Sequence, residues 1–233
     1  MTKTEVMKEL RANGSAQTRK IYRRHGATGD LFGVSYAFLG KMKRKIKTDQ
    51  KLAEQLWATG NYDARNLATM IADPSSMTAA DLQSWAKGLE DHHSAAALSN
   101  VAADAASAKG TMEKWIASKY EMIACAGWHT LASIARQVND LDDAYFQRHL
   151  EKIETRIHHS DNWVRYAMNN ALINIGVRNS KLEKVAIAAA RRIGPVEVDH
   201  GETSCKTPEA VSYIKKTVAH KKKKAAKQRR KTG

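Results

Sequence analysis

The segment Asp161-Asn162-Trp163-Val164-Arg165-Tyr166 brings an aromatic ring, a guanidinium and an amide together beside a predicted helix start. Short polar residues at a helix N-terminus stand where the first backbone N–H groups have no partner within the helix. Those N–H groups can receive a phosphate while a neighbouring arginine pairs with it. The pattern therefore predicts phosphate contacts by Trp163, Arg165 and Tyr166. The alternative is that Trp163 is a core residue and that Arg165 lies on a solvated helix face.

A second group of reactive side chains lies in the segment 196–205, VEVDHGETSC. His200 and Cys205, with Asp199 or Glu202, are residue types that bind zinc. Zinc sites usually show repeated pairs of ligands, and this segment has none. We therefore interpret it as a structured turn that docks the last helix, with Thr207 as the helix cap and Pro208 at the first helical position.

Adjacent histidines occur twice, as His92-His93 and His158-His159. Neighbours on a helix diverge by about 100°, so neither pair is a natural chelate, and both are expected to be structural. The sequence has no glycine-rich phosphate loop and no Gly-x-Ser-x-Gly motif, which leaves nucleotide hydrolysis and serine acyl chemistry without support. The prediction is that the protein has no metal ion, no cofactor and no bound nucleotide.

The C-terminus carries most of the positive charge. Residues 215–231, KKTVAHKKKKAAKQRRK, contain ten lysines and arginines and no acid, out of a formal net charge of +15. Residues 1–214 hold 29 basic and 24 acidic side chains, a net charge of +5. A dense block of like charges repels itself and cannot bury apolar surface, so residues 221–233 are predicted to be a flexible basic tail. Nucleic acid is the expected polyanion, since neutralising phosphates releases counterions; the alternative is a solubilising tail.

Composition places the rest of the chain among folded, helix-rich proteins. The 233 residues are 42% hydrophobic, with three prolines and thirteen glycines, and alanine is abundant. A membrane span needs roughly 18 to 20 consecutive apolar residues, and no run in the sequence approaches that length. The N-terminus has no apolar run like that of a signal peptide. The cysteines, Cys125 in an apolar helical run and Cys205 in a polar loop, fit a reducing compartment. We predict a cytoplasmic protein without a membrane segment.

Helical periodicity recurs along the chain, and the short segment 196–198 is the one weak strand signal, so the fold class is predicted to be all-α. Caps and stops divide the chain into thirteen helices, at 3–12, 15–24, 36–46, 49–58, 62–71, 79–88, 92–106, 111–119, 121–138, 142–158, 162–175, 180–193 and 208–219. Pairs of such helices follow one another about every 35 to 45 residues, which is the spacing of HEAT or armadillo repeats. The expected architecture is one α-α superhelix over residues 1–220, whose concave surface binds an extended partner.

Three segments carry a resemblance to a known family. Residues 31–74 contain Phe32-Gly33-Val34 opening a helix, Leu56-Trp57 before a turn, and a helix from Asp63 that ends near Pro74. With residues 114–135 and 158–176, this order resembles the DNA alkylation repair family of HEAT-like-repeat proteins, relatives of the AlkD-type alkylpurine DNA glycosylases. The resemblance implies a right-handed superhelix of helix pairs with a basic concave cleft that cradles duplex DNA.

The resemblance also implies a reaction. The family's glycosylases use a carboxylate, an arginine and flanking tryptophans to stabilise an oxocarbenium-like state while a cationic alkylated base departs. Aligning residues 82–102 with the family's tryptophan-then-aspartate helix puts His92 at the aromatic position and Ala96 at the acid. The arginine position falls near Cys125, and the second tryptophan falls at Asn170. The expectation is a DNA-binding scaffold with a degenerate glycosylase site.

A shifted register would bring other residues into the site: Asp91 or Trp85 into the first position, and Arg165 or Trp163 into the last. If the chain is active, Asp91 is the candidate acid, and the reaction is release of N3- or N7-alkylated purines. The cluster from Lys41 to Lys47 is basic, but its members point in different directions on a helix.

The predicted partner is DNA, either duplex, damaged or branched, bound largely without sequence preference. The predicted DNA-binding residues are Trp163, Arg165, Tyr166, Asn169, His92, Trp85, Lys43 and Lys119. The competing function is a non-catalytic scaffold for protein partners, because helical repeats bind proteins as well as DNA.

Overall fold

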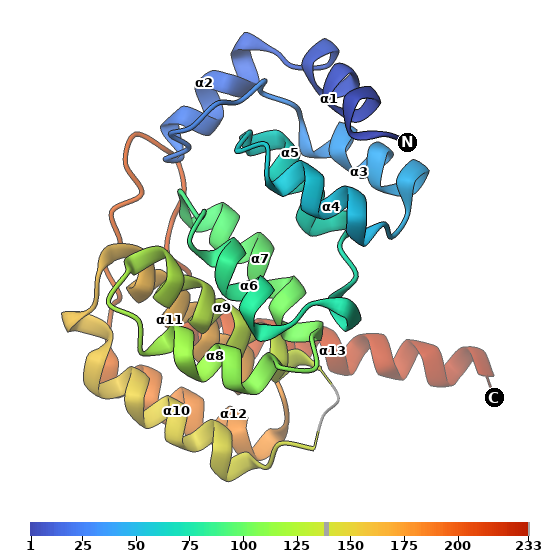
Figure 1. Ribbon diagram of the computed structural model, residues 1–233. Helices are drawn as coiled ribbons and strands as arrows, with labels where there is room; N and C mark the ends of the chain where they lie inside the picture. Colours follow the sequence, from blue (N-terminus) through green and yellow to red (C-terminus); the bar gives the residue numbers. More distant parts are fainter. Residues whose placement is uncertain (138–139, 233) are drawn as a thin grey trace. The chain divides into compact units, whose positions relative to one another are not determined.

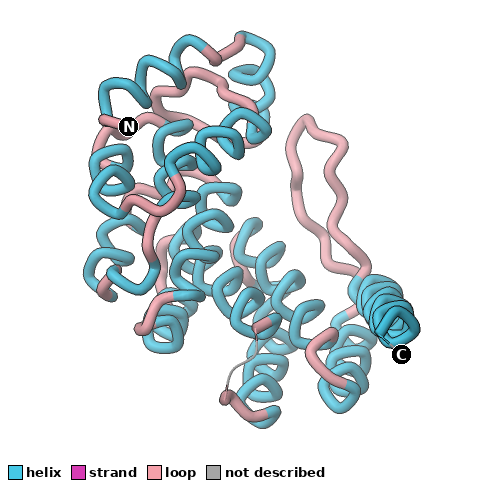
Figure 2. Tube along the Cα trace, turned by 90° about the vertical axis from the view of Figure 1, so that its right-hand side faces the viewer, coloured by secondary structure: helices cyan, strands magenta, loops and turns pink. Residues whose placement is uncertain are grey.

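The computed structural model describes residues 1–137 and 140–232. That part of the chain forms thirteen α-helices and two 3-10 helices (Figure 1). Figure 2 shows helices and loops throughout, and within the described residues the one β-bridge joins Gly14 to Val34. The all-α prediction is confirmed. Among these helices, none combines the length and the apolar character needed to cross a membrane.

The α-helices are α1 (Lys3–Ala12), α2 (Ala16–Arg24), α3 (Tyr36–Ile46), α4 (Gln50–Trp57), α5 (Tyr62–Ile71), α6 (Ala79–Ala86), α7 (His92–Asp104), α8 (Ala108–Ile116), α9 (Glu121–Arg136), α10 (Asp143–Arg156), α11 (Asn162–Gly176), α12 (Ser180–Ile193) and α13 (Ala210–Thr232). The 3-10 helices are η1 (Pro74–Ser76) and η2 (Ile157–His159). The predicted helix 121–138 ends at Arg136, and its last predicted residue, Val138, lies outside the described part of the chain.

Polar side chains set most helix starts, as the sequence indicates. In α1 the Thr2 hydroxyl accepts from the Glu5 N–H at 3.3 Å while the Glu5 carboxylate accepts from the Thr2 N–H at 2.8 Å. Such reciprocal caps satisfy two N–H groups that the helix itself leaves unpaired. The predicted cap of the last helix is wrong. Its carboxylate cap is Glu209, which accepts from the N–H groups of Val211 and Ser212, and α13 begins at Ala210.

The chain divides into two compact units. The first comprises Met1–Thr130 with His200–Cys205, and the second Leu131–Asp199 with Lys206–Gly233. In the first unit α4 packs on α5 and α6 on α7, while α3, α5 and α7 lie side by side in that order. Leucines that are completely buried, Leu56, Leu67, Leu82 and Leu98, fill the space between these helices. This arrangement places α3, α5 and α7 around one groove.

In the second unit α10 and α12 lie side by side, and α11 packs against α12 and α13. Gly176 near the end of α11 permits a close approach, because an added Cβ would lie 2.7 Å from Cδ1 of Ile214 and 2.9 Å from Cβ of Ala186. Phe146 on α10 is completely buried, with the Arg178 guanidinium 4.6 Å from its ring centroid. Thus the second unit also consists of packed helix pairs.

The last helix continues into the basic segment. The sequence predicts a helix end near Ala219, whereas α13 runs to Thr232. Lysine, alanine, glutamine and arginine all have high helix propensity, so the backbone of this run favours a helix despite its charge. Lys221 also anchors the start of the run, since its ammonium group donates to the carbonyl of Val177 at 3.0 Å. The flexibility of residues 221–233 as a unit stays a prediction.

Candidate nucleic-acid interface

A groove of about 600 Å³ lies between α3, α5 and α7 in the first unit. The residues that α7 contributes to the groove recur at helical spacing, so one face of that helix lines the groove. The lining residues are Tyr36, Lys43, Thr48, Thr69, Met70, Ala72, Pro74, His93, Ala96, Ala97, Asn100, Val101 and Asp104.

Two residues give the α3 wall its chemistry. Tyr36 is 45% exposed and Lys43 is exposed, and they lie two turns apart on the same face of the helix. The Tyr36 hydroxyl is 3.4 Å from Oδ1 of Asn66, and burial raises the pKa of Tyr36 to about 12. A neutral phenol and an ammonium group are therefore available along this wall, a pair suited to a phosphate backbone.

The α7 wall holds the position aligned with the family's acid. Ala96 lines the groove and is half-buried, so a methyl group stands there. The carboxylate among the lining residues belongs to Asp104, more than two turns further along α7. Sequence reasoning missed Asp104 and Tyr36, although the spacing of positions 93, 96, 100 and 104 on a predicted helix was a usable signal.

Asp91, the predicted acid, caps α7. Its Oδ1 accepts from the N–H groups of His93 at 2.7 Å and Ser94 at 2.9 Å. The residue is 3% exposed, and burial raises the pKa of its carboxyl, against the lowering effect of the Ser94 backbone and of His93. Asp91 is not among the residues that line the groove. A catalytic role for Asp91 stays a prediction, and its visible role is to begin the helix that carries the groove wall.

The segment before α3 is fixed by one buried carboxylate. Asp63, completely buried on α5, accepts from the backbone N–H groups of Phe32 at 2.6 Å, Gly33 at 3.0 Å and Val34 at 2.8 Å. Gly33 has a φ of +78°, a conformation that residues with a Cβ rarely adopt. The motif that carries the family resemblance thus holds the start of α3, and with it Tyr36, in place.

Three histidines meet beside the groove. One ring nitrogen of each of His25, His92 and His93 lies within 4.8 Å of the others. The rings of His92 and His93 are 4.0 Å apart between centroids, so the expectation that this adjacent pair diverges is wrong. The residues are the first two of α7, where the rings can turn towards the chain before the helix. Burial, then the neighbouring histidines, lowers the pKa of His92 to about 3.

Trp85 lies in the core of the first unit. It is 5% exposed and stacks on Trp57 with 4.4 Å between ring centroids and 2° between ring planes. The Arg65 guanidinium lies 5.3 Å from the Trp57 ring centroid and pairs with Glu90 at 3.1 Å. A DNA contact by Trp85 stays a prediction that requires this stack to open.

Lys119 lies in the connection between α8 and α9. It is exposed, and its ammonium group lies 5.5 Å from the ring centroid of Tyr120, which is itself 63% exposed. A cation–π contact at an exposed site is weak, about 0.5–1 kcal/mol. Lys119 and Lys43 are thus the predicted contacts of the first unit whose cationic groups lie at the surface.

The predicted contacts on α11 hold another part of the chain. Arg165 donates to the carbonyls of Glu197 at 2.8 Å and Ser160 at 3.1 Å, and Asn169 donates to the carbonyl of Pro208 at 2.9 Å. One turn before Arg165, Asn162 exchanges two hydrogen bonds of 2.8 Å with the backbone of Asp199. These side chains bind both ends of the segment between α12 and α13.

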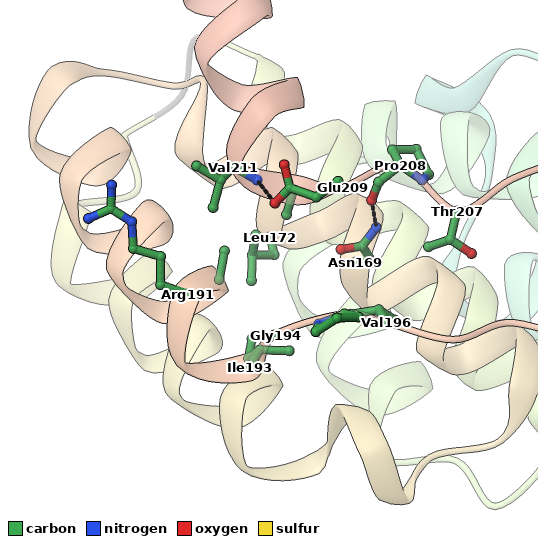
Figure 3. A pocket seen from close by; sticks show the side chains of 13 residues that line it. Asn169, Leu172, Arg191, Ile193, Gly194, Val196, Thr207, Pro208, Glu209 and Val211 are labelled. Atoms are coloured by element: carbon green, nitrogen blue, oxygen red, sulfur yellow. Dashed lines mark hydrogen bonds between the residues drawn. The ribbon is translucent and has the colours of Figure 1, made fainter.

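Trp163 and Tyr166 flank this arrangement, half-buried and in edge-to-face contact at 6.0 Å between ring centroids. A cavity of about 320 Å³ lies between α11, the end of α12 and the start of α13. Figure 3 shows Asn169 bound to Pro208 at its edge and Leu172, Ile193 and Val196 around it. The segment that α11 holds forms part of the cavity wall. The shape of the cavity therefore depends on the hydrogen bonds that α11 makes to this segment.

Replacing Arg165 with alanine is expected to loosen the segment 195–208. The change removes two hydrogen bonds from a partly buried charged group, each worth about 1.5–3 kcal/mol. We expect faster limited proteolysis within the segment and a lower melting temperature. The control is Arg156→Ala at the exposed end of α10. Equal proteolysis of the two variants, with weaker DNA binding in Arg165→Ala alone, would favour the phosphate contact over the clamp.

The fold and the groove define a HEAT-like-repeat protein. The chain belongs to the DNA alkylation repair family, since the model of the family described as DNA alkylation repair enzyme matches residues 6–214.

Similar proteins extend this result. The chain is 30% identical over 214 residues to an uncharacterised protein of Listeria innocua (Lin0241), covering 89% of this chain and 93% of that protein. It is 30% identical over 216 residues to one of Listeria monocytogenes (Lmo0209), with the same coverage. A solved structure superposes with a TM-score of 0.86 at 32% identity, covering 94% of this chain and 95% of the other. That structure is described as a new family of proteins related to the HEAT-like repeat DNA glycosylases with affinity for branched DNA structures. The predicted family and fold are confirmed.

Proposed function

We propose that the protein binds branched DNA through its phosphate backbone and does not release alkylated bases. The observation that carries the proposal is the groove of the first unit. Its walls offer Lys43 and Tyr36 to a phosphate, and they include Ala96, the residue that the sequence alignment matches to the acid of the family's glycosylases.

Two further findings support DNA as the partner. The structural relative described as having affinity for branched DNA is similar along almost the whole chain, which supports DNA as the partner of this protein. The C-terminal run of lysines and arginines adds a cationic segment. Backbone contacts carry no sequence information, so we expect little preference for base sequence.

The other aligned positions support loss of the reaction. Cys125, at the position of the family's arginine, is completely buried in α9, and burial raises the pKa of its thiol. A neutral thiol cannot replace a guanidinium beside a phosphate. Asn170, at the position of the second tryptophan, is a half-buried amide without an aromatic ring. None of the three aligned positions therefore carries the type of side chain that the family's glycosylases use there.

The test is a binding titration with labelled four-way junction, gapped duplex and plain duplex at several salt concentrations. We expect the junction to bind most tightly, and we expect Lys43→Ala to reduce the slope of log affinity against log salt by about one unit. The matched control is Lys51→Ala, an exposed lysine on α4 outside the groove lining.

An equal effect of the Lys43 and Lys51 changes would show that the groove is not the contact surface. Absence of binding to all three DNAs at low salt would contradict the proposed function and would favour a scaffold for protein partners.

A further inference from the structure

The three histidines beside the groove come from two separate parts of the sequence. His25 follows the last residue of α2, and His92 and His93 are the first residues of α7. One nitrogen of each ring lies within 4.8 Å of the other two. His92 is 7% exposed and His93 is more accessible, so the cluster reaches from the core to the surface.

Two charged side chains fix the turn that follows His25: Arg23 ties it to α2, and Glu90 ties it to the segment before α7. Arg23 donates to the carbonyls of Ala27 at 2.9 Å and Gly29 at 2.7 Å, and also to that of Thr28. From the other side, Glu90 accepts from the N–H groups of Thr28 at 3.2 Å and Gly29 at 2.5 Å. Glu90 lies two residues before His92. The segment that carries His92 and His93 therefore also holds the turn that follows His25.

Gly26 completes this turn. Its φ of +96° reverses the chain directly after His25, and an added Cβ would lie 3.6 Å from Cβ of Asp91. The backbone around all three histidines is thus fixed before any ligand arrives. Preorganised ligands lose less conformational entropy on binding an ion.

The chemistry of the cluster suits a transition-metal cation. Imidazole nitrogens are common ligands of zinc-class ions, which bind the neutral ring. The buried side chain of Asp91, directly before His92, interacts electrostatically with His93 and so lies beside the cluster.

We propose that His25, His92 and His93 bind a divalent transition-metal ion of the zinc class. Three histidines with one open position are a common zinc ligand set, and tetrahedral bonds of about 2.0–2.1 Å place the ligand nitrogens about 3.3 Å apart. The separations here are up to 4.8 Å, so the ring nitrogens would have to move closer by up to about 1.5 Å to hold one ion. His93 also lines the groove, so the site borders the groove. His200 of the segment 196–205 interacts electrostatically with His92, so that segment lies near the site, but it supplies none of the three ligands.

The test uses untagged full-length protein stripped with a chelator. Zn²⁺ is titrated calorimetrically, and Co²⁺ is titrated by visible absorption, which reports tetrahedral coordination. We expect one equivalent of either ion to bind, and we expect His25→Gln or His93→Gln to weaken binding at least about tenfold. Zn²⁺ should raise the melting temperature of the wild type and leave that of His25→Gln unchanged.

Two control variants are expected to bind as the wild type does: the double variant His158→Gln, His159→Gln, and Cys205→Ser. Circular dichroism verifies that each variant is folded. The proposal is overturned if the wild type shows no stoichiometric binding, if folded His25→Gln binds equally well, or if binding is lost in Cys205→Ser. None of these measurements requires DNA, so the metal site and the proposed function stand or fall separately.

Discussion

Duplex DNA containing 7-methylguanine or 3-methyladenine is expected to remain intact when incubated with an excess of this protein. The methyl group of Ala96 supplies no negative charge opposite a developing sugar cation, and this position lines the groove directly. Losing one preorganised electrostatic partner typically costs a factor of about 10² to 10³ in rate. A single-turnover assay on methylated duplex should therefore show excision that is undetectable or at least about a hundredfold slower than that of an active family member.

Two variants make this result decisive. Asp91→Asn retains a good N-cap, because asparagine caps helices as well as aspartate does, and it removes only the charge. Asp104→Asn removes the carboxylate that lines the groove. Robust excision by the wild type that disappears in Asp91→Asn would show that the alignment is shifted and would identify the acid. Disappearance in Asp104→Asn instead would assign the reaction to the far end of α7.

Most of the fold was predictable because its signals are local. The predicted helices 36–46, 62–71 and 180–193 coincide with α3, α5 and α12. Ser35, Asn61 and Asn179 accept from N–H groups in the first turns of these helices, as short polar residues before an apolar helical pattern do. The start of α13 was misassigned because a glutamate two residues after Thr207 provides the cap, and its reach depends on backbone geometry.

The candidate site was less predictable, because its contacts join distant parts of the chain. Nothing near His92 in the sequence indicates that a turn clamped by Arg23 and Glu90 brings His25 to it. Arg165 and Asn169 were predicted from the sequence to contact DNA, and that role stays a prediction. The sequence did not show that backbone carbonyls of the segment between α12 and α13 occupy their donors. A periodic pattern shows which residues share a face, but not which groups that face meets.

Deleting residues 221–233 is expected to produce the largest change in DNA affinity. The deleted segment contains eight lysines and arginines. Each contact with a phosphate on B-DNA contributes about 0.9 to the slope of log affinity against log salt. Lys221 is already bound to the Val177 carbonyl, so a flexible tail would reach phosphate with the other seven and contribute a slope of about six.

The size of the change in the salt slope also shows whether the tail is flexible or helical when it binds DNA. Consecutive residues on a helix point in different directions, so a tail that stays helical as in α13 presents about half of its charges to one duplex. The expected flattening is then about three units. A full-length variant with Lys222, Lys223 and Lys224 changed to glutamine preserves helix propensity and removes charge, and it serves as the matched control. Anisotropy titrations from low to moderate salt measure all three proteins. An unchanged slope after deletion would show that the tail does not contact DNA, leaving Lys43 and the groove as the phosphate-binding surface.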